Sequence, residues 1–314
     1  MPLNFTRKEY KSRLEKTRHA MDKYQIDVLF TCDPSNMAWL TGYDGWSFYV
    51  HQGVIIGPDG DPVFWGRNMD ANGALRTTYM ESADIIGYSD DYVMSEEHHA
   101  MEHLSQTICE RGWGEMALGV EMENYYFSAR AYQILNQKFQ GPIKDATALV
   151  NWQRAVKSPT ELTYMRRAAK IVEGMHQRIN KTFKPGIRKC DVVAEIYDAA
   201  LRGSEDENGK FGGDYPAFVP LLPTGKDASA AHLTWDDKIL KKDAGTFFEI
   251  AGCYRRYHVP LCRTIYLGQP PREMLTAEEA ILEGIENAIA ASISGNTAGD
   301  VASAFYNVLE KRGI

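Results

Sequence analysis

The segment from Thr246 to Gly268 constrains the fold more than any other part of the chain. Its first run, TFFEIAG, is rich in strand-forming residues, and its second, YRRYHVPLCRTIY, alternates apolar and polar residues. This pattern predicts the two strands of a β-hairpin. Glu249 lies inside the apolar run, where a carboxylate is rarely buried without a partner or a task. Burial would raise its pKa toward the range of a general base, whereas an outward-facing Glu249 on an edge strand would have no such role.

A lone histidine, His232, precedes this hairpin in the stretch AAHLTW. The polar turn DDKILKKDAG separates it from the strand that carries Glu249. Two strands joined by such a turn can pair side by side, so we expect His232 to lie near Glu249. These two residues are the predicted catalytic pair. The alternative for His232 is a half-buried core histidine without a catalytic role.

The second strand of the predicted hairpin is rich in basic side chains, namely Arg255, Arg256, His258 and Arg263. An arginine that faces a cleft can hold a carboxylate through two parallel hydrogen bonds. The strand therefore offers candidate ligands for an acidic group of a substrate, although each arginine taken alone is more often a solvated surface residue.

Two aromatic, glycine-containing loops are further candidates for substrate binding. Four rings fall within six positions of the loop 43–53, namely Trp46, Phe48, Tyr49 and His51. Such a loop suits a lid over a small cationic or zwitterionic ligand through cation–π contacts, and core packing is an equally good interpretation. The second loop, FGGDYPAF at 211–218, offers Tyr215 as its best polar candidate.

The first half of the chain alternates strand-like and helix-like segments. Apolar runs with strand-forming residues lie at 26–32, 50–56, 62–65, 83–88 and 116–122, and helical patterns at 6–24, 34–42, 96–112 and 128–139. Such alternation predicts an α/β layered domain over residues 1–156.

A domain boundary is predicted at Lys157–Thr160, where Ser158 or Thr160 can cap the next helix. Over residues 157–314 we expect two helices, then strands around His232 and Glu249, and then two more helices. The four helices are predicted at 160–183, 190–203, 276–292 and 298–313.

Charge and composition argue against several classes of protein. The chain has 35 basic and 42 acidic residues, a net charge of −7, and lacks a long basic run, which argues against nucleic-acid binding. No window approaches the roughly 18 apolar residues of a membrane helix, and the charged N-terminus has no apolar signal core, so we predict a cytoplasmic protein. The five scattered cysteines indicate reduced thiols and no zinc site.

Taken together, these segments resemble the pita-bread family, which includes methionine aminopeptidase, aminopeptidase P, prolidase and creatinase. The resemblance covers essentially the whole chain and is carried by NMAWLTGYDGWSFYVHQGVII, FGGDYPAFVPLLPTG, AAHLTWDD and FFEIAGCYRRYHVPLCRTIYLG. It implies a creatinase-like α/β N-terminal domain and an α+β pita-bread catalytic domain. Within the family, the sequence is most similar to the ectoine-hydrolase branch, with the creatinases as close relatives.

The family's metal site is altered in this sequence. In its metallopeptidases a histidine precedes a strand with one aspartate ligand, and a second aspartate lies three residues before an Arg-Thr pair. Matched here, these positions are His232, Glu249 and Pro260, ahead of Arg263-Thr264. Proline offers no ligand atom, so we expect neither a dinuclear metal site nor another cofactor. Creatinase, a metal-free hydrolase of this fold, has a glutamate where this chain has Cys262.

The resemblance implies a metal-independent hydrolase that opens the cyclic amidine ring of ectoine and yields N-acetyl-diaminobutyrate. On this interpretation His232 is a general acid/base, and Glu249 holds the amidinium and activates water or attacks directly. Arg255 or His258 binds the carboxylate of the small zwitterionic substrate. The rest of the expected pocket comprises Trp46, Phe48, Tyr49, His51, Tyr215, Cys262 and Arg263.

The resemblance also implies a homodimer in which the loop 43–53 completes the partner's site. Family members continue with strands that supply another histidine and glutamates, so we expect the catalytic domain to extend beyond Ile314. Three alternatives stay open: a metal-dependent Xaa-Pro dipeptidase or aminopeptidase, a creatinase-like amidinohydrolase, and a non-catalytic pita-bread binding module.

Overall fold

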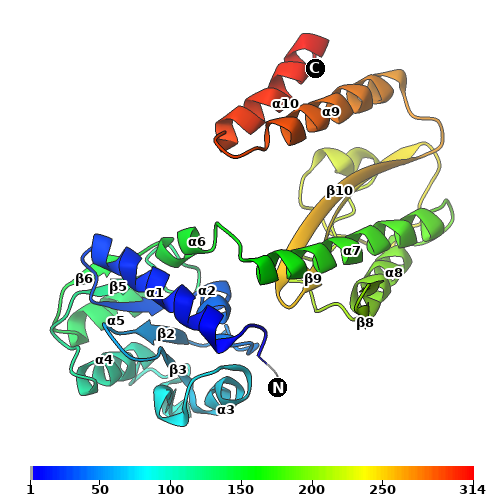
Figure 1. Ribbon diagram of the computed structural model, residues 1–314. Coiled ribbons are helices and arrows are strands. Elements are labelled where there is room, and N and C mark those ends of the chain that lie inside the picture. Colours follow the sequence, from blue (N-terminus) through cyan, green and yellow to red (C-terminus); the bar gives the residue numbers. More distant parts are fainter. Residues whose placement is uncertain (1–2) are drawn as a thin grey trace. The chain divides into compact units, whose positions relative to one another are not determined.

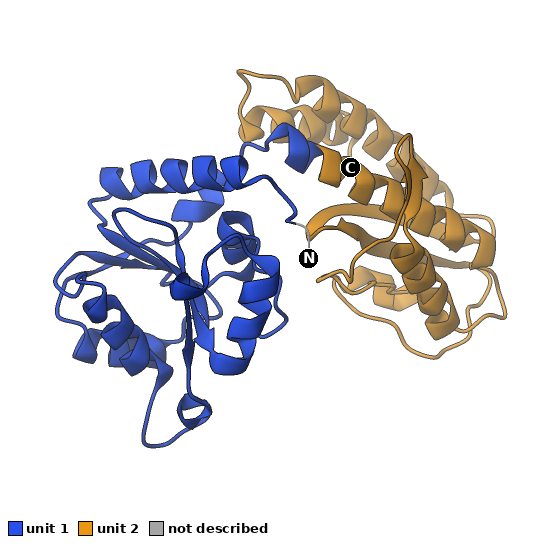
Figure 2. Cartoon of the chain, turned by 60° about the horizontal axis from the view of Figure 1, so that its bottom comes forward, with its two compact units in different colours: residues 1–162 blue, residues 163–314 orange. Residues whose placement is uncertain are grey.

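The computed structural model describes residues 3–314. The chain divides into two compact units, Met1–Leu162 and Thr163–Ile314 (Figures 1 and 2). The N-terminal unit has two clusters of buried apolar residues and the C-terminal unit has one. No helix within residues 3–314 is both long and apolar enough to cross a bilayer.

A six-stranded sheet forms the centre of the N-terminal unit, in the order β4-β3-β2-β1-β5-β6. The strands are β1 (Val28–Thr31), β2 (Gly53–Ile56), β3 (Val63–Arg67), β4 (Ile85–Tyr88), β5 (Leu118–Val120) and β6 (Ile143–Asp145). β2 pairs antiparallel with both β1 and β3, so the strand-like runs predicted at 50–56 and 62–65 form a hairpin. The remaining neighbours are parallel.

Helices cover both faces of this sheet, because successive strand residues point to opposite sides. Leu29 and Phe64 lie in one apolar cluster and their neighbours Phe30 and Trp65 in the other. The first cluster includes residues of α1 (Arg7–Lys23), α2 (Pro34–Thr41), α3 (Asn68–Thr77) and α6 (Leu149–Gln153), and the second includes residues of α4 (Ala100–Glu110) and α5 (Ala129–Lys138). The predicted α/β layered domain is confirmed (Figure 1).

Two short 3₁₀ helices, η1 (Ser82–Asp84) and η2 (Asp90–Tyr92), complete this unit. The helix predicted from residue 96 begins only at Ala100, because His99 caps it. The Nδ1 atom of His99 accepts a hydrogen bond from the Met101 amide at 3.2 Å. A side chain that satisfies a free amide in this way marks the start of a helix.

A long antiparallel hairpin of β9 (Ala244–Tyr254) and β10 (Tyr257–Leu267) organises the C-terminal unit, as predicted. Helices α7 (Pro159–Thr182) and α8 (Lys189–Arg202) share an apolar cluster with one face of it. The approach of α7 is close, because a Cβ atom on Gly252 would collide with the carbonyl oxygen of Ala168. The unit also contains β7 (Ser204–Asp206), β8 (Gly209–Phe211), η3 (Gly225–Ser229), α9 (Arg272–Ala291) and α10 (Ala298–Arg312).

The four helices predicted for this half are confirmed, with small shifts at their ends. Helix α10 begins with a reciprocal cap, in which the Thr297 side chain accepts from the Asp300 amide and the Asp300 carboxylate accepts from the Thr297 amide. Helices around a strand pair give the predicted α+β class (Figure 1).

Candidate active site on the long hairpin

The register of the hairpin sorts its residues onto two faces. Directly opposed residues in an antiparallel pair share a face, and neighbours along each strand alternate. Ile250 lies opposite Leu261, and both belong to the apolar cluster that includes α7 and α8. Glu249 lies opposite Cys262 and therefore shares the other face with it. Pro260, opposite Ala251, is on this second face too.

Glu249 is half-buried at the centre of the second face. Its backbone amide donates to the Leu221 carbonyl at 3.1 Å, and its own carbonyl accepts from the Leu221 amide at 3.0 Å. Burial, and next the negative charge of Glu249, raise the pKa of the Cys262 thiol. The carboxylate and the thiol are therefore electrostatic neighbours, and the thiol is held in its protonated form.

The strand pairing predicted for His232 is wrong. The segment beside β9 is Leu221–Thr224, which bridges to Glu249 and Thr246. His232 lies instead in an exposed turn after η3, with a φ of 64°. A left-handed residue interrupts an extended strand, so the chain around His232 does not continue alongside β9.

The arginines of the second strand lie away from Glu249's face. Arg255 and Arg256 form the two-residue turn between β9 and β10, with φ values of 49° and 67°, as a tight turn of this twist requires. The Arg255 guanidinium lies 5.5 Å from the Tyr164 ring centroid. Arg263 is opposite Phe248 and so belongs to the helix-facing side, where its charge adds to burial in lowering the pKa of His176.

His258 and Tyr215 lie at the tip of the hairpin. The Ala217 amide donates to His258 Nε2 at 3.0 Å, and His258 Nδ1 lies 3.0 Å from the Arg256 carbonyl oxygen. The ring of Tyr215, 42% exposed, lies under the Arg256 guanidinium, 3.7 Å from centroid to Cζ. The structure thus brings these two predicted residues together through Arg256.

The four predicted lid residues lie together in the N-terminal unit. Trp46 and Tyr49 are 62% and 60% exposed. Phe48 contacts Trp46, with centroids 5.0 Å apart, and the His51 ring lies 4.9 Å from that of His99. Phe48, Tyr49 and His51 line a cavity of about 350 Å³. Burial, followed by the nearby His99, lowers the pKa of His51 to about 4, so this ring is neutral at physiological pH.

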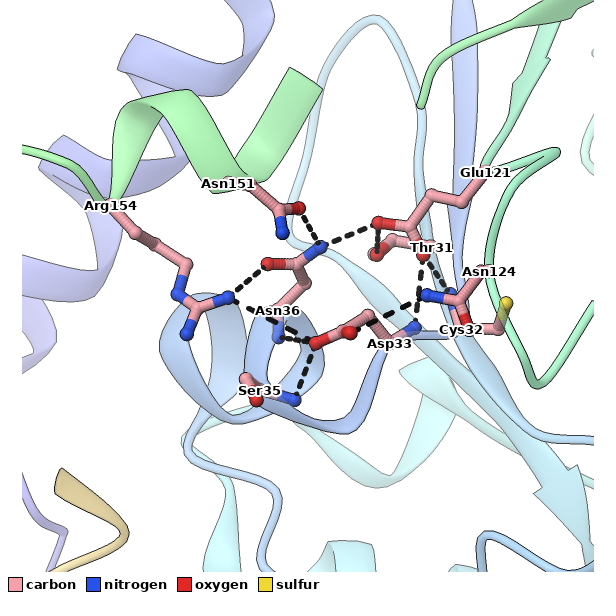
Figure 3. Close-up of polar contacts among 9 residues, drawn as sticks. All are labelled: Thr31, Cys32, Asp33, Ser35, Asn36, Glu121, Asn124, Asn151 and Arg154. Carbon is pink, nitrogen blue, oxygen red and sulfur yellow. Dashed lines mark hydrogen bonds and ion pairs between the residues drawn. The ribbon is translucent and has the colours of Figure 1, made fainter. Parts of the chain in front are cut away.

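A buried polar network, missed in the sequence, fixes the helix that leads into this loop (Figure 3). Glu121, 3% exposed, accepts hydrogen bonds from the Thr31 hydroxyl, the Asn36 amide group and the backbone amides of Cys32 and Asp33. Asn36 also bonds to Asn151 and Arg154 of the segment around α6. A sequence signal existed, because Glu121 lies inside the apolar run MALGVEM just as Glu249 lies inside TFFEIAG.

The residues of this hairpin do not fit the paired metal site that the pita-bread resemblance associates with metallopeptidases. Glu249 is the single carboxylate on its face of the two strands, and Pro260 has no ligand atom. Across residues 3–314, histidine, cysteine, aspartate and glutamate side chains form no group of three placed to hold a metal ion. The arrangement suits instead a single carboxylate that meets a cationic or electrophilic substrate.

Comparisons with known proteins agree over both units. A model of the creatinase/prolidase N-terminal domain matches residues 13–156, and one of metallopeptidase family M24 matches residues 163–314. The chain is 55% identical to an ectoine hydrolase of Halomonas elongata, over 99% of the chain and 79% of that protein. It is 35% identical to an uncharacterized hydrolase/peptidase of Sinorhizobium fredii, over the same shares. A solved prolidase from Thermococcus sibiricus, 18% identical, superposes with a TM-score of 0.81 over 97% of the chain and 78% of the prolidase, a likeness of fold.

Proposed function

Because the chain belongs to the creatinase/prolidase-like family of pita-bread hydrolases, we propose that it hydrolyses a C–N bond in the cyclic amidine ring of ectoine. The observation that carries this proposal is the 55% identity to an ectoine hydrolase along 99% of the chain. The half-buried Glu249, alone among carboxylates on its face of the hairpin, supports it, since ectoine carries an amidinium.

The proposed reaction adds one water to the electron-poor amidinium carbon. The resulting tetrahedral centre collapses with cleavage of one ring C–N bond, and the departing nitrogen takes up a proton. The product is N-acetyl-diaminobutyrate. We assign Glu249 to hold the amidinium and to activate the water, or to attack the carbon itself, in which case the same water later cleaves the bond to Glu249. His232 is proposed as the acid/base that moves the proton.

The role of Glu249 is tested by E249Q, which keeps the shape but removes the charge. Loss of a general base lowers kcat by about 100-fold or more, so E249Q should turn over ectoine at most at about 1% of the wild-type rate. D237N, at an exposed site, is the matched control. An E249Q variant with wild-type kcat would exclude Glu249 from the chemistry. H232Q, assayed in parallel, tests the proton-transfer role.

Metal independence is the second part of the proposal, and Pro260 at the second ligand position supports it. The test is ectoine turnover by the full-length protein in excess chelator, for which we expect unchanged kcat. Loss of activity that is restored by added Mn²⁺, Co²⁺ or Zn²⁺ would refute it and would favour the second candidate, a metal-dependent Xaa-Pro dipeptidase. That candidate is kept because residues 163–314 match a metallopeptidase family. Absence of any turnover would indicate a non-catalytic pita-bread module.

Of the two predicted ligands of the substrate carboxylate, Arg255 lies in the hairpin turn away from Glu249's face, and both ring nitrogens of His258 already contact backbone groups, so we assign neither to that carboxylate. We propose a homodimer, in the cytoplasm, in which the loop 43–53 closes over the partner's Glu249 site. Two inactive variants, W46A and E249Q, test this by subunit mixing. If each site uses both subunits, a 1:2:1 mixture restores one intact site per heterodimer and about a quarter of wild-type activity. No recovery in a mixture with proven subunit exchange would refute the shared site.

A further inference from the structure

The loop Gly212–Phe218, which carries Tyr215, is fastened to the tip of the β9–β10 hairpin by several contacts. Where the loop starts, the Gly213 amide donates to the Leu201 carbonyl of α8, and a Cβ on Gly213 would collide with the Ala200 carbonyl oxygen. The Asp214 amide then donates to the Cys253 carbonyl at 3.0 Å. These bonds bring the loop onto the hairpin just before Tyr215.

A second set of contacts involves side chains of both the loop Gly212–Phe218 and the hairpin tip. The Asp214 carboxylate accepts a hydrogen bond from the Arg256 amide at 3.2 Å, and the Arg256 guanidinium covers the Tyr215 ring. Two residues further on, the Ala217 amide donates to His258 Nε2. Tyr215 is therefore held between two backbone anchors, at Asp214 and at Ala217.

The partners of His258 determine which ring nitrogen carries the proton. A backbone amide can only donate, so Nε2 must present its lone pair to Ala217. A carbonyl oxygen can only accept, so Nδ1 must carry the hydrogen that points to Arg256. The ring is thus required in one neutral tautomer, and a second proton on Nε2 would replace the bond to Ala217 with a donor–donor contact.

We propose that His258 is a positioning residue, which holds the loop Gly212–Phe218 against the hairpin tip through its neutral Nδ1–H tautomer and so sets the place of Tyr215. The effect of this contact on substrate binding rests on the proposed function, whereas the contact between His258 and the loop Gly212–Phe218 does not. Burial is the main cause that lowers the pKa of His258, and it favours the neutral form. The hydrogen bond to the Arg256 backbone and the charge of Asp214 act in the opposite direction, whereas the charge of Arg256 acts with burial. Cys253 Sγ also faces the ring, 3.9 Å from Nδ1.

The test is hydrogen exchange of the peptide that contains residues 212–218, measured on the full-length protein without substrate. H258L removes the acceptor and releases the exposed Ala217 amide to water, so exchange in this peptide should rise about 2-fold to 10-fold. H258Q offers an amide oxygen in place of Nε2, so exchange should return to near the wild-type rate. H19Q, at an exposed histidine of α1, is the control for histidine loss.

Acidification gives an independent measurement if H258L does not fold. In the wild type, lowering the pH should open this loop before the rest of the unit, after correction for the intrinsic pH dependence of exchange, and H258Q should abolish that step. Equal exchange in wild type and H258L, or an H258Q variant with the same acid-induced opening as wild type, would overturn the proposal. Ectoine turnover is measured separately. A KM for ectoine that is raised in H258L and restored in H258Q supports the positioning role. Absence of turnover in the wild type refutes only the proposed function.

Discussion

Replacing Glu121 by glutamine tests the buried network most directly. Each Glu121 oxygen accepts two hydrogen bonds, Oε1 from Thr31 and Asn36 and Oε2 from the amides of Cys32 and Asp33. A glutamine amide has one oxygen, so its NH₂ group must face two of these donors. The loss of stability is smallest when this NH₂ group faces Thr31 and Asn36, because the Thr31 hydroxyl can rotate and accept a hydrogen bond from it.

The magnitude follows from the bonds that cannot be rescued. Asn36 cannot turn its amide group, because its own oxygen accepts from Arg154. At least one bond to a charged acceptor is then lost, and a buried donor is left unsatisfied, at about 1.5–3 kcal/mol each. Relief from burying a charge offsets part of this cost. We expect E121Q to lower the free energy of unfolding by about 3 kcal/mol, which for a unit of this size lowers Tm by about 6–12 °C.

The assay is urea unfolding followed by tryptophan fluorescence, which reports chiefly on the N-terminal unit because five of the six tryptophans lie in it. E123Q, two residues away and exposed, is the matched control and should change the free energy of unfolding by less than about 0.5 kcal/mol. A loss below about 1 kcal/mol in E121Q, or equal losses in both variants, would refute the view that this network stabilises the start of α2.

Two further predictions concern burial and packing. The folded pKa of His51 is about 4, below that of the unfolded chain, so the unfolded state binds more protons between these values and stability falls as pH drops from about 6.5 toward 4. At pH 5 the loss is about 2 kcal/mol, and H51Q should remove this part of the pH dependence of urea unfolding, whereas H19Q should not. G252A should lower the free energy of unfolding by about 2 kcal/mol or more, because the added methyl meets the backbone of Ala168 and Val172 in α7. G245A, whose methyl meets only side chains at 3.5 Å or beyond, should be nearly neutral. Because both sites lie in the C-terminal unit, the measurement is urea unfolding followed by far-UV circular dichroism, which reports on the helices and strands of both units.

Local signals in the sequence predicted most of the secondary structure. The β9–β10 hairpin, the β2–β3 hairpin and the helices other than α3 and α6 follow from periodicity and caps, which depend on residues a few positions apart. The start of α4 is instructive: the polar run before Ala100 has a helical composition, yet His99 sets the start of the helix by accepting the Met101 amide. Amino-acid composition does not distinguish a side chain that caps a helix from one that continues it.

The pairing of distant strands did not follow from the sequence. The segments around His232 and Leu221 both precede β9, and only the tertiary structure places Leu221 beside Glu249. The left-handed backbone at His232 is a single-residue feature with no periodic signal. The register of the two strands likewise decides which hairpin residues share a face. It puts Cys262 on the face of Glu249, and it puts Arg263 on the opposite face.

The sequence by itself determined the fold family, the two fold classes and the loss of a ligand atom at Pro260, because these are carried by residue types and local pattern. The tertiary structure decided which polar groups meet. Glu121 reaches Thr31 and Asn36 across 90 and 85 residues of sequence, and His258 meets Ala217 across 41. Such contacts depend on how strands and loops that are far apart in the sequence are brought together in space. Neither propensity nor periodicity encodes this arrangement, because both depend on residues close together in the sequence.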